Sequence, residues 1–230
     1  GGRVTRIARV VCRGGPHHVT QRGNRGGTVF FTDEDRRGYL QLLREYSVRH
    51  AVEVLAYCLM SNHVHLVVVP TTAYGLHRAL KPLHMRHAQR VNRACGWSGH
   101  LWQGRYFSSA LDEAHLWAAI RYVERNPVRA GMTRRAQDFP WSSATAHCGG
   151  PADPVLTPGA YWLRQFAMVR DWAAFLGHPD EPRSLEILRR NAGKGLPCGS
   201  TEFLDALQQA TGRIIRDRPV GRPATPARKG

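Results

Sequence analysis

The spacing of hydrophobic residues along the chain switches between a period of two, typical of strands, and a period near 3.6, typical of helices. The short period predicts extended segments over residues 6–12, 17–21, 52–60, 63–69 and 105–110. The longer period predicts helices over residues 32–50, 76–91 and 111–126. The resulting order, β-α-β-β-α-(β)-α, predicts an α+β fold with an antiparallel sheet and helices on one of its faces.

Local signals predict where these helices begin and end. Thr32 is followed three residues later by Asp35, which is typical of a capping box at a helix start. Pro82 lies within the second helical segment and indicates either a kink or the start of the helix. Pro127 is expected to close the third helix at Asn126, because the residue before a proline is pushed out of helical geometry.

A boundary is predicted at Gly149-Gly150-Pro151, where turn-forming residues cluster. We expect a first domain over residues 1–149 and a small, mainly helical C-terminal extension over residues 150–212. The extension has helical patterns at 161–176, 184–191 and 201–211. Residues 213–230 are rich in Pro, Gly and Arg and predict a loose basic tail.

Charge narrows the class of partner. The 230 residues hold 33 Lys and Arg against 17 Asp and Glu, a formal charge of +16. Residues 1–150 hold 21 of these cations and nine of these anions, and no acidic residue lies between Glu53 and Asp112. Such a surface favours a polyanion, with nucleic acid ahead of an anionic membrane. The alternative is a coding bias, since 30 of the 33 cations are arginine.

Cellular location is predicted from what the sequence lacks. No apolar run reaches the length of a membrane span, and no segment resembles a signal peptide. The five cysteines are widely spaced and form no CxxC pair, which suits a reducing compartment. We therefore expect a cytoplasmic, nucleoid-associated protein with no membrane partner.

Candidate chemistry begins at His63-Val64-His65 in a predicted strand. Residues two apart on a strand face the same side, so both imidazoles can take neighbouring positions on a divalent metal. Tyr122 and Asn126 lie four residues apart on a predicted helix and share a face, where the Asn amide oxygen is a third, hard ligand. Taken separately, each pair has a plainer interpretation: polar residues on a half-exposed strand, and a packed tyrosine with an asparagine that ends its helix.

Together these residues carry a resemblance. His63-Val64-His65 resembles the HUH motif (His, hydrophobe, His) of single-strand DNA nucleases. The chain resembles the single-tyrosine transposases, and most closely the REP-associated tyrosine transposases related to the IS200/IS605 group. The stretches that carry this resemblance run in family order over roughly residues 16–145: His18 to Asn24, Ala56 to Ser61, Leu101 to Tyr106, Arg121 to Gly131, and Trp141-Ser142-Ser143.

The resemblance implies a ferredoxin-like, HUH-type sheet and a specific chemistry. By its pattern, Tyr122 is the nucleophile that attacks a DNA phosphodiester, and His63, His65 and Asn126 hold Mg²⁺ or Mn²⁺. Related enzymes carry Gln at the Asn126 position, so the shorter amide requires the helix end to lie closer to the metal. The implied substrate is single-stranded DNA with hairpins such as REP elements, and the implied state is a monomer or a homodimer.

Aromatic and basic residues between positions 78 and 107 suggest how DNA is held, because bases stack on aromatic rings and phosphates attract cations. The plainer alternatives are a core aromatic patch, a solvated basic helix face and a solvated tail. We expect DNA contacts from Arg22, Arg86, Arg90, Arg93, Trp102, Arg105, Tyr106 and, in the tail motif Gly221-Arg222-Pro223, Arg222.

Several alternatives stay open. Tyr106 is a rival nucleophile, although it lacks an Asn or Gln four residues on. His17 and His18 are strand residues near the site, for which a structural or DNA-backbone role is the plainer interpretation. At the level of function, the alternatives are a catalytically silent regulator that binds DNA or RNA with the same fold, and a replication initiator or relaxase. The latter class usually carries a second Tyr on the same helix or a helicase domain, and Tyr122 is the only Tyr between residues 107 and 160.

Overall fold

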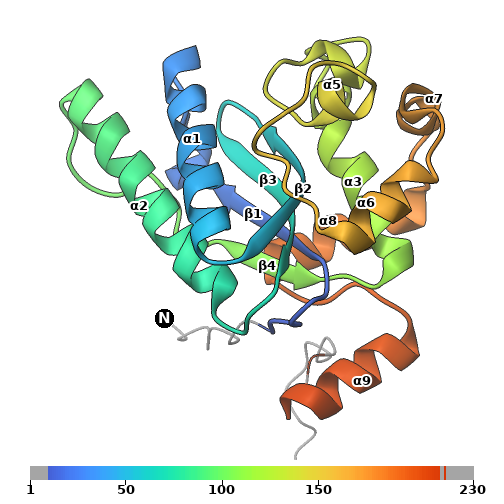
Figure 1. The fold of residues 1–230 in the computed structure, drawn as a ribbon. Helices are drawn as coiled ribbons and strands as arrows, with labels where there is room; N and C mark the ends of the chain where they lie inside the picture. The colour runs from blue at the N-terminus through green and yellow to red at the C-terminus, as the bar shows by residue number, and fades with distance from the viewer. Residues whose placement is uncertain (1–9, 213–214, 216–230) are drawn as a thin grey trace, which may run out of the picture.

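A four-stranded antiparallel sheet with the strand order β2-β3-β1-β4 forms the centre of the molecule (Figure 1). The computed structural model describes residues 10–212 and residue 215. In β3, His63 lies opposite Arg22 and His65 lies opposite Thr20 of β1. The strands are β1 (His17–Arg22), β2 (Val52–Leu59), β3 (His63–Pro70) and β4 (Phe107–Ala110).

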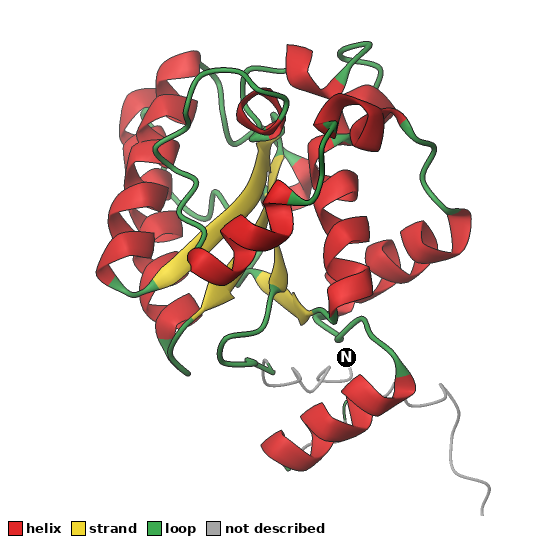
Figure 2. Ribbon diagram, turned by 45° about the vertical axis from the view of Figure 1, so that its right-hand side comes forward, coloured by secondary structure: helices red, strands yellow, loops and turns green. Residues whose placement is uncertain are grey.

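Helices surround this sheet (Figure 2). The α-helices are α1 (Asp33–Arg49), α2 (Gly75–Cys95), α3 (Glu113–Glu124), α4 (Asn126–Arg129), α5 (Ala144–His147), α6 (Ala160–Ala167), α7 (Trp172–Gly177), α8 (Pro182–Lys194) and α9 (Thr201–Thr211). Two short 3₁₀ helices are η1 (Asn24–Gly26) and η2 (Ala136–Asp138). No helix in the described part of the chain is long and apolar enough to cross a membrane.

The α+β class and the antiparallel sheet are confirmed, but the expectation that helices lie on one face only is wrong. Val64, Leu66 and Val68 of β3 join a core with α1 and α2. Val67 and Val69 join a second core with α3 on the opposite face. Because β3 is apolar at nearly every position from Val64 to Val69, both of its faces must be covered. Figure 1 shows α1 and α2 on one side of the sheet and α3, α6 and α8 on the other.

The predicted start of α1 is confirmed. The Thr32 hydroxyl accepts a hydrogen bond from the Asp35 backbone N–H, and the Asp35 carboxylate accepts from the Thr32 N–H, so the capping box is complete. Pro82 lies inside α2, which already begins at Gly75, and therefore does not mark the start of that helix. Residues 10–12 form no strand, and the rest of the predicted segment 6–12 lies outside the described residues.

The third predicted helix ends earlier than expected. Helix α3 stops at Glu124, Arg125 leaves helical geometry (φ −85°, ψ 1°), and a one-turn helix, α4, begins at Asn126. Pro127 has no backbone N–H and restricts the residue before it, but it suits the first turn of a new helix. Tyr122 and Asn126 therefore lie on two successive helices rather than on one continuous helix.

The C-terminal extension packs against the α3 side of the sheet. Helix α8 contacts α3, β1 and β4. The segment predicted as one helix over 161–176 is two helices, α6 and α7, because the Asp171 side chain accepts a hydrogen bond from the Ala174 N–H and starts a new helix there. Helices α8 and α9 occupy the other two predicted segments. The predicted tail, apart from residue 215, lies outside the described residues.

Candidate functional site

Two imidazoles and one phenol meet on the face of the sheet that α3 covers. His63 and His65 face the same side of β3, as the strand pattern predicts, and their ring centroids are 4.9 Å apart. The Tyr122 ring on α3 stands edge-on to His65, with centroids 5.4 Å apart. Tyr122 belongs to the same core as Val67 and Val69, the β3 neighbours of these histidines. The structure thus brings together His63, His65 and Tyr122 from β3 and α3.

Each histidine has one ring nitrogen engaged by a neighbouring side chain. His63 Nδ1 lies 2.6 Å from Asn62 Oδ1. His65 Nδ1 lies 2.9 Å from Nε2 of His18, a buried residue of β1. Metal-binding histidines are commonly oriented in this way by a hydrogen bond to their second nitrogen. With Nδ1 engaged, Nε2 is the nitrogen of His63 and His65 that could bind a metal.

Burial keeps all three imidazoles neutral at neutral pH. It lowers the pKa of His63 to about 4, with a further contribution from the nearby charge of Arg22. It lowers the pKa of His65 well below its usual value, assisted by His18, His63 and Arg129. The pKa of His18 falls to about 4 through burial and the charge of Arg129. A neutral imidazole carries the lone pair that a metal ion needs.

The donor set present here fits a divalent cation that prefers nitrogen and oxygen ligands. Asn126, at the start of α4, has a buried Nδ2 atom without a hydrogen-bond partner. A half-turn of the amide exchanges Nδ2 with Oδ1, so this position can present an oxygen to a cation. Among the described residues, no group of three or more His, Cys, Asp and Glu side chains is arranged to hold a metal. His63 and His65 thus offer two nitrogen donors, and Asn126 carries an amide whose oxygen is of the type that such cations bind.

A guanidinium group lies against the tyrosine. The Cζ atom of Arg129, in α4, is 4.2 Å from the centroid of the Tyr122 ring. The same guanidinium donates a hydrogen bond to the Tyr122 carbonyl oxygen and lies 3.3 Å from a carboxylate oxygen of Asp180. Arg129 therefore places a permanent cation beside the tyrosine and the neutral imidazoles.

The predicted base-stacking residues lie elsewhere. Trp102 and Tyr106 are buried in the core with α1 and α2, and the Trp102 Nε1–H donates to the His84 carbonyl oxygen at 2.9 Å. Their burial agrees with the core aromatic patch that the sequence offered as the plainer alternative, and their contact with bases stays a prediction. Both residues line a cavity of about 760 Å³ together with Lys81 and the exposed Arg105. Tyr106 is also on the face of the sheet opposite to His65.

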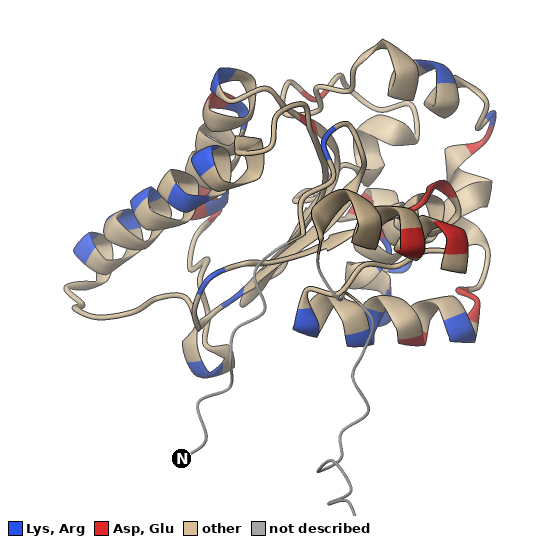
Figure 3. Ribbon diagram, turned by 90° about the horizontal axis from the view of Figure 1, so that it is seen from below, with Lys and Arg blue, Asp and Glu red and all other residues tan. Residues whose placement is uncertain are grey.

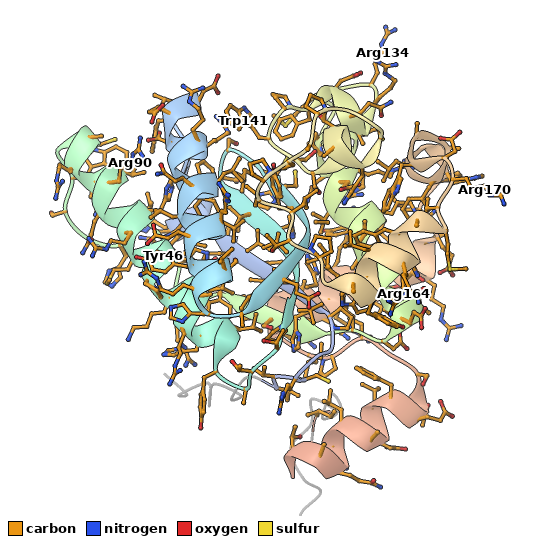
Figure 4. All side chains as sticks on the ribbon, in the orientation of Figure 1. Tyr46, Arg90, Arg134, Trp141, Arg164 and Arg170 are labelled. Atoms are coloured by element: carbon orange, nitrogen blue, oxygen red, sulfur yellow. The ribbon has the colours of Figure 1, made fainter. Side chains whose placement is uncertain are left out.

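Of the three α2 arginines that were expected to contact DNA, Arg90 forms an ion pair within the chain. Arg86 and Arg93 are exposed, and Figure 3 shows cations spaced along this long helix. Arg90, at the upper end of α2 in Figure 4, lies 2.9 Å from a carboxylate oxygen of Glu34 on α1. Arg22 is exposed at the end of β1, opposite His63. Arg222 lies outside the described residues.

Sequence reasoning missed two residues of this site and undervalued a third. His18 was named only as a strand residue near the site, whereas it contacts His65 directly. Because side chains alternate along a strand, the position of His18 in β1 could have predicted that it lies on the same face as His65. It could not have predicted the direct contact between the two rings. Arg129 and Asp180 were not identified, because their contacts depend on the break between α3 and α4 and on the fold of the extension.

Comparison with known proteins finds a family and solved structures to which this chain is similar. Residues 16–126 match the family model described as "Transposase IS200 like". Among solved structures, the chain resembles a REP-associated tyrosine transposase bound to a REP hairpin, at 18% identity and a TM-score of 0.51 over 68% of this chain and 92% of that one. A second similar structure is a candidate transposase from Deinococcus radiodurans R1, at 22% identity and a TM-score of 0.36 over 54% of this chain and 95% of that one. A search of curated proteins found no match.

The family match spans β1 to Asn126, and so contains His63, His65 and Tyr122. The fold of the REP-associated transposase extends over two thirds of the chain. Residues 16–126, just under half of the chain, are therefore similar to the IS200-like transposases.

Proposed function

We propose that this chain is a metal-dependent endonuclease and strand transferase that cuts single-stranded, hairpin-containing DNA through a 5′-phosphotyrosine. The observation that carries the proposal is the edge-on contact of Tyr122 with His65, 5.4 Å between centroids, beside His63 on the same strand. A phenol, two neutral imidazoles and an amide are the groups that this reaction requires. The similarity of residues 16–126 to the IS200-like transposases supports the same assignment.

In the proposed cleavage, Tyr122 Oη attacks the phosphorus of a phosphodiester. The Oη–P bond forms, the bond from phosphorus to the 3′ oxygen breaks, the phenol loses its proton, and the leaving oxygen gains one to become a free 3′-OH. His63, His65 and Asn126 would hold a divalent metal, which would polarise the phosphate as a Lewis acid and offset its charge. A phenol has a pKa near 10 and is a weak nucleophile at neutral pH, so its position relative to the phosphate matters.

Strand transfer follows from the same intermediate. The phosphotyrosine bond retains the energy of the phosphodiester, so the 3′-OH of another strand end can attack the phosphorus and release Tyr122. No nucleotide cofactor is needed for this exchange. The chain would thereby nick and rejoin DNA with one nucleophile.

The proposed substrate is single-stranded DNA folded into REP-like hairpins, bound by a monomer or a homodimer. A REP hairpin is the ligand named for the solved structure of similar fold. Arg22 next to His63, together with the exposed Arg86, Arg93 and Arg105, offers cations for phosphates. Arg222, in the tail, is proposed as an auxiliary contact.

The test is formation of a covalent protein–DNA adduct. We expect the full chain, incubated with a single-stranded hairpin oligonucleotide and Mg²⁺ or Mn²⁺, to give an adduct that survives denaturing electrophoresis. Tyr122→Phe should abolish it, whereas the matched variant Tyr106→Phe should retain it. Absence of an adduct with the intact chain, or an undiminished adduct in Tyr122→Phe, contradicts the proposal. Hairpin binding without any adduct would favour a catalytically silent DNA-binding regulator instead.

A further inference from the structure

The side chain of Arg129 holds Tyr122 at two points. Its guanidinium lies over the phenol ring, with Cζ 4.2 Å from the centroid, and also donates to the backbone carbonyl oxygen of Tyr122. Carbonyls in the last turn of a helix have no partner within the helix, and α3 ends two residues after Tyr122. One residue therefore fixes the end of α3 and the face of the ring.

Arg129 is held in turn by the C-terminal extension. Asp180, in the segment between α7 and α8, places a carboxylate oxygen 3.3 Å from Arg129 Nη1 and 3.7 Å from Arg125 Nε. The side chain of Asp180 is 14% exposed and those of both arginines are 16% exposed. Arg125 also donates to the carbonyl oxygens of Leu176, at 2.8 Å, and His178. Two arginines from the α3–α4 junction thus bind one short stretch of the extension.

This contact differs from an ordinary surface ion pair. Exposed pairs contribute little, because water screens them and long side chains lose freedom. Here the carboxylate faces two poorly exposed guanidinium groups, so removal of Asp180 would leave two buried cations next to each other. We expect Arg129 to move when Asp180 is replaced, because the attraction that opposes this repulsion is lost.

We propose that Arg129 and Asp180 are positioning residues for Tyr122, and that the extension thereby completes a site whose other residues lie in the transposase domain. The inference rests on the proposed function. Its basis is geometric: nucleophilic attack depends on the direction from which the phenol oxygen approaches phosphorus, and a displacement near 1 Å can cost roughly 100-fold in rate. The guanidinium removes rotational freedom from the ring that must make this approach.

A matched control lies on the same helix. Arg121 of α3 places its Cζ 4.8 Å from the ring of Phe175 on α7, and so also links α3 to the extension through a cation–π contact. It does not act on Tyr122 through any contact described above. Arg121→Ala weakens the attachment of the extension and leaves the Arg129–Tyr122–Asp180 contacts in place.

The experiment measures the single-turnover rate of adduct formation at saturating hairpin DNA with Mn²⁺, and in parallel the Kd for that DNA. We expect Arg129→Ala to lower the rate about 10- to 100-fold, while the Kd changes by less than about threefold. Asp180→Asn, which keeps the size of the side chain, should lower the rate by a smaller factor. The double variant should be no slower than Arg129→Ala alone, because both act through one contact. Arg129→Lys should recover part of the rate, since it retains the cation but not the planar fork.

A merely structural role predicts a different pattern. The rate would then follow the thermal unfolding midpoint, Arg121→Ala would be slowed as much as Arg129→Ala, and Arg129→Lys would recover nothing. That pattern, or a full rate in Arg129→Ala, overturns the inference while the proposed function stands. If the unaltered chain forms no adduct, the proposed function fails, and the inference fails with it.

Discussion

Histidine and tyrosine meet on both faces of the central sheet, and the two groups differ in what their polar atoms contact. On the α2 face, His84 Nε2 lies 3.1 Å from the Tyr39 hydroxyl, and His87 Nε2 lies 2.8 Å from the Val29 carbonyl oxygen. Tyr39 is fully buried, and burial raises its pKa far above the ordinary value. On the α3 face, Tyr122 keeps 9% of its surface exposed and contacts His65 with the edge of its ring.

The two faces differ in which histidine and tyrosine atoms already have a hydrogen-bond partner. On the α2 face, one ring nitrogen of each histidine pairs with a phenol or a backbone carbonyl inside a core, while His87 Nδ1 is buried without a partner. On the α3 face, Asn62 and His18 take the Nδ1 atoms of His63 and His65, and a guanidinium covers the phenol ring. A cluster of imidazoles and a tyrosine is therefore not a site in itself. The orientation imposed by the neighbouring residues distinguishes the proposed ligand set from a packed polar core.

The largest expected effect comes from removing one imidazole on each face. We expect His65→Ala to lower the rate of adduct formation by more than about 100-fold, beyond what loss of an outer partner of a metal ligand costs. His87→Ala should instead leave the rate at saturating DNA near that of the unaltered chain and lower the free energy of unfolding by about 2–4 kcal/mol, because His87 is fully buried among Phe30, Tyr39 and Trp102.

Adduct formation and chemical denaturation, measured on both variants, check this pair. Arg170→Ala serves as a surface control, since Figure 4 shows Arg170 pointing away from the body of the molecule. Equal losses of rate in His65→Ala and His87→Ala would remove the distinction between the two faces.

A smaller effect is expected from two neighbours on β1. His18 contacts His65, whereas the adjacent His17 bonds to the Gly15 carbonyl oxygen and the Cys12 N–H. We expect His18→Gln to weaken Mn²⁺ binding about 10- to 100-fold by freeing the His65 ring, and His17→Gln to leave it unchanged. Calorimetric titration with Mn²⁺ measures both. If His17→Gln weakens binding as much as His18→Gln, the hydrogen bond to His65 is not what orients the ligand.

Much of the fold and part of the site follow from the sequence. The alternation in β3 fixed the face on which His63 and His65 lie, because a strand side chain has only two directions. The same apolar run should have indicated helices on both faces, since Val64 to Val69 leave neither side polar. Tyr122 lies in a helix as predicted, but the break at Arg125 was missed, because the same proline pattern fits a helix end and a helix restart. Contacts such as His18 with His65 and Asp180 with Arg129 join residues far apart in the chain, and no local pattern encodes them.

The effect that distinguishes the two faces least is the pH dependence of stability, which both share. Burial lowers the pKa of His87 on one face and of His18 and His63 on the other, each to about 4. Between pH 6.5 and about 4 the unfolded chain therefore binds more protons than the folded one. Stability is full above this window, falls as the pH decreases through it, and levels off below it. Each such histidine contributes at most about 1.4 kcal/mol per pH unit.

Denaturation curves at a series of pH values, with and without Mn²⁺, separate the contribution of His87 to stability from that of the histidines on the α3 face. His87→Gln should reduce the slope between pH 6.5 and 4 equally in both conditions, because His87 is remote from the proposed ligands. Mn²⁺ should add stability at neutral pH, and this addition should vanish as acid protonates His63 and His65, since only neutral imidazoles bind a metal. A Mn²⁺-induced gain that persists well below pH 4, or one that disappears in His87→Gln, would show that the histidines of the α3 face are not the ligands.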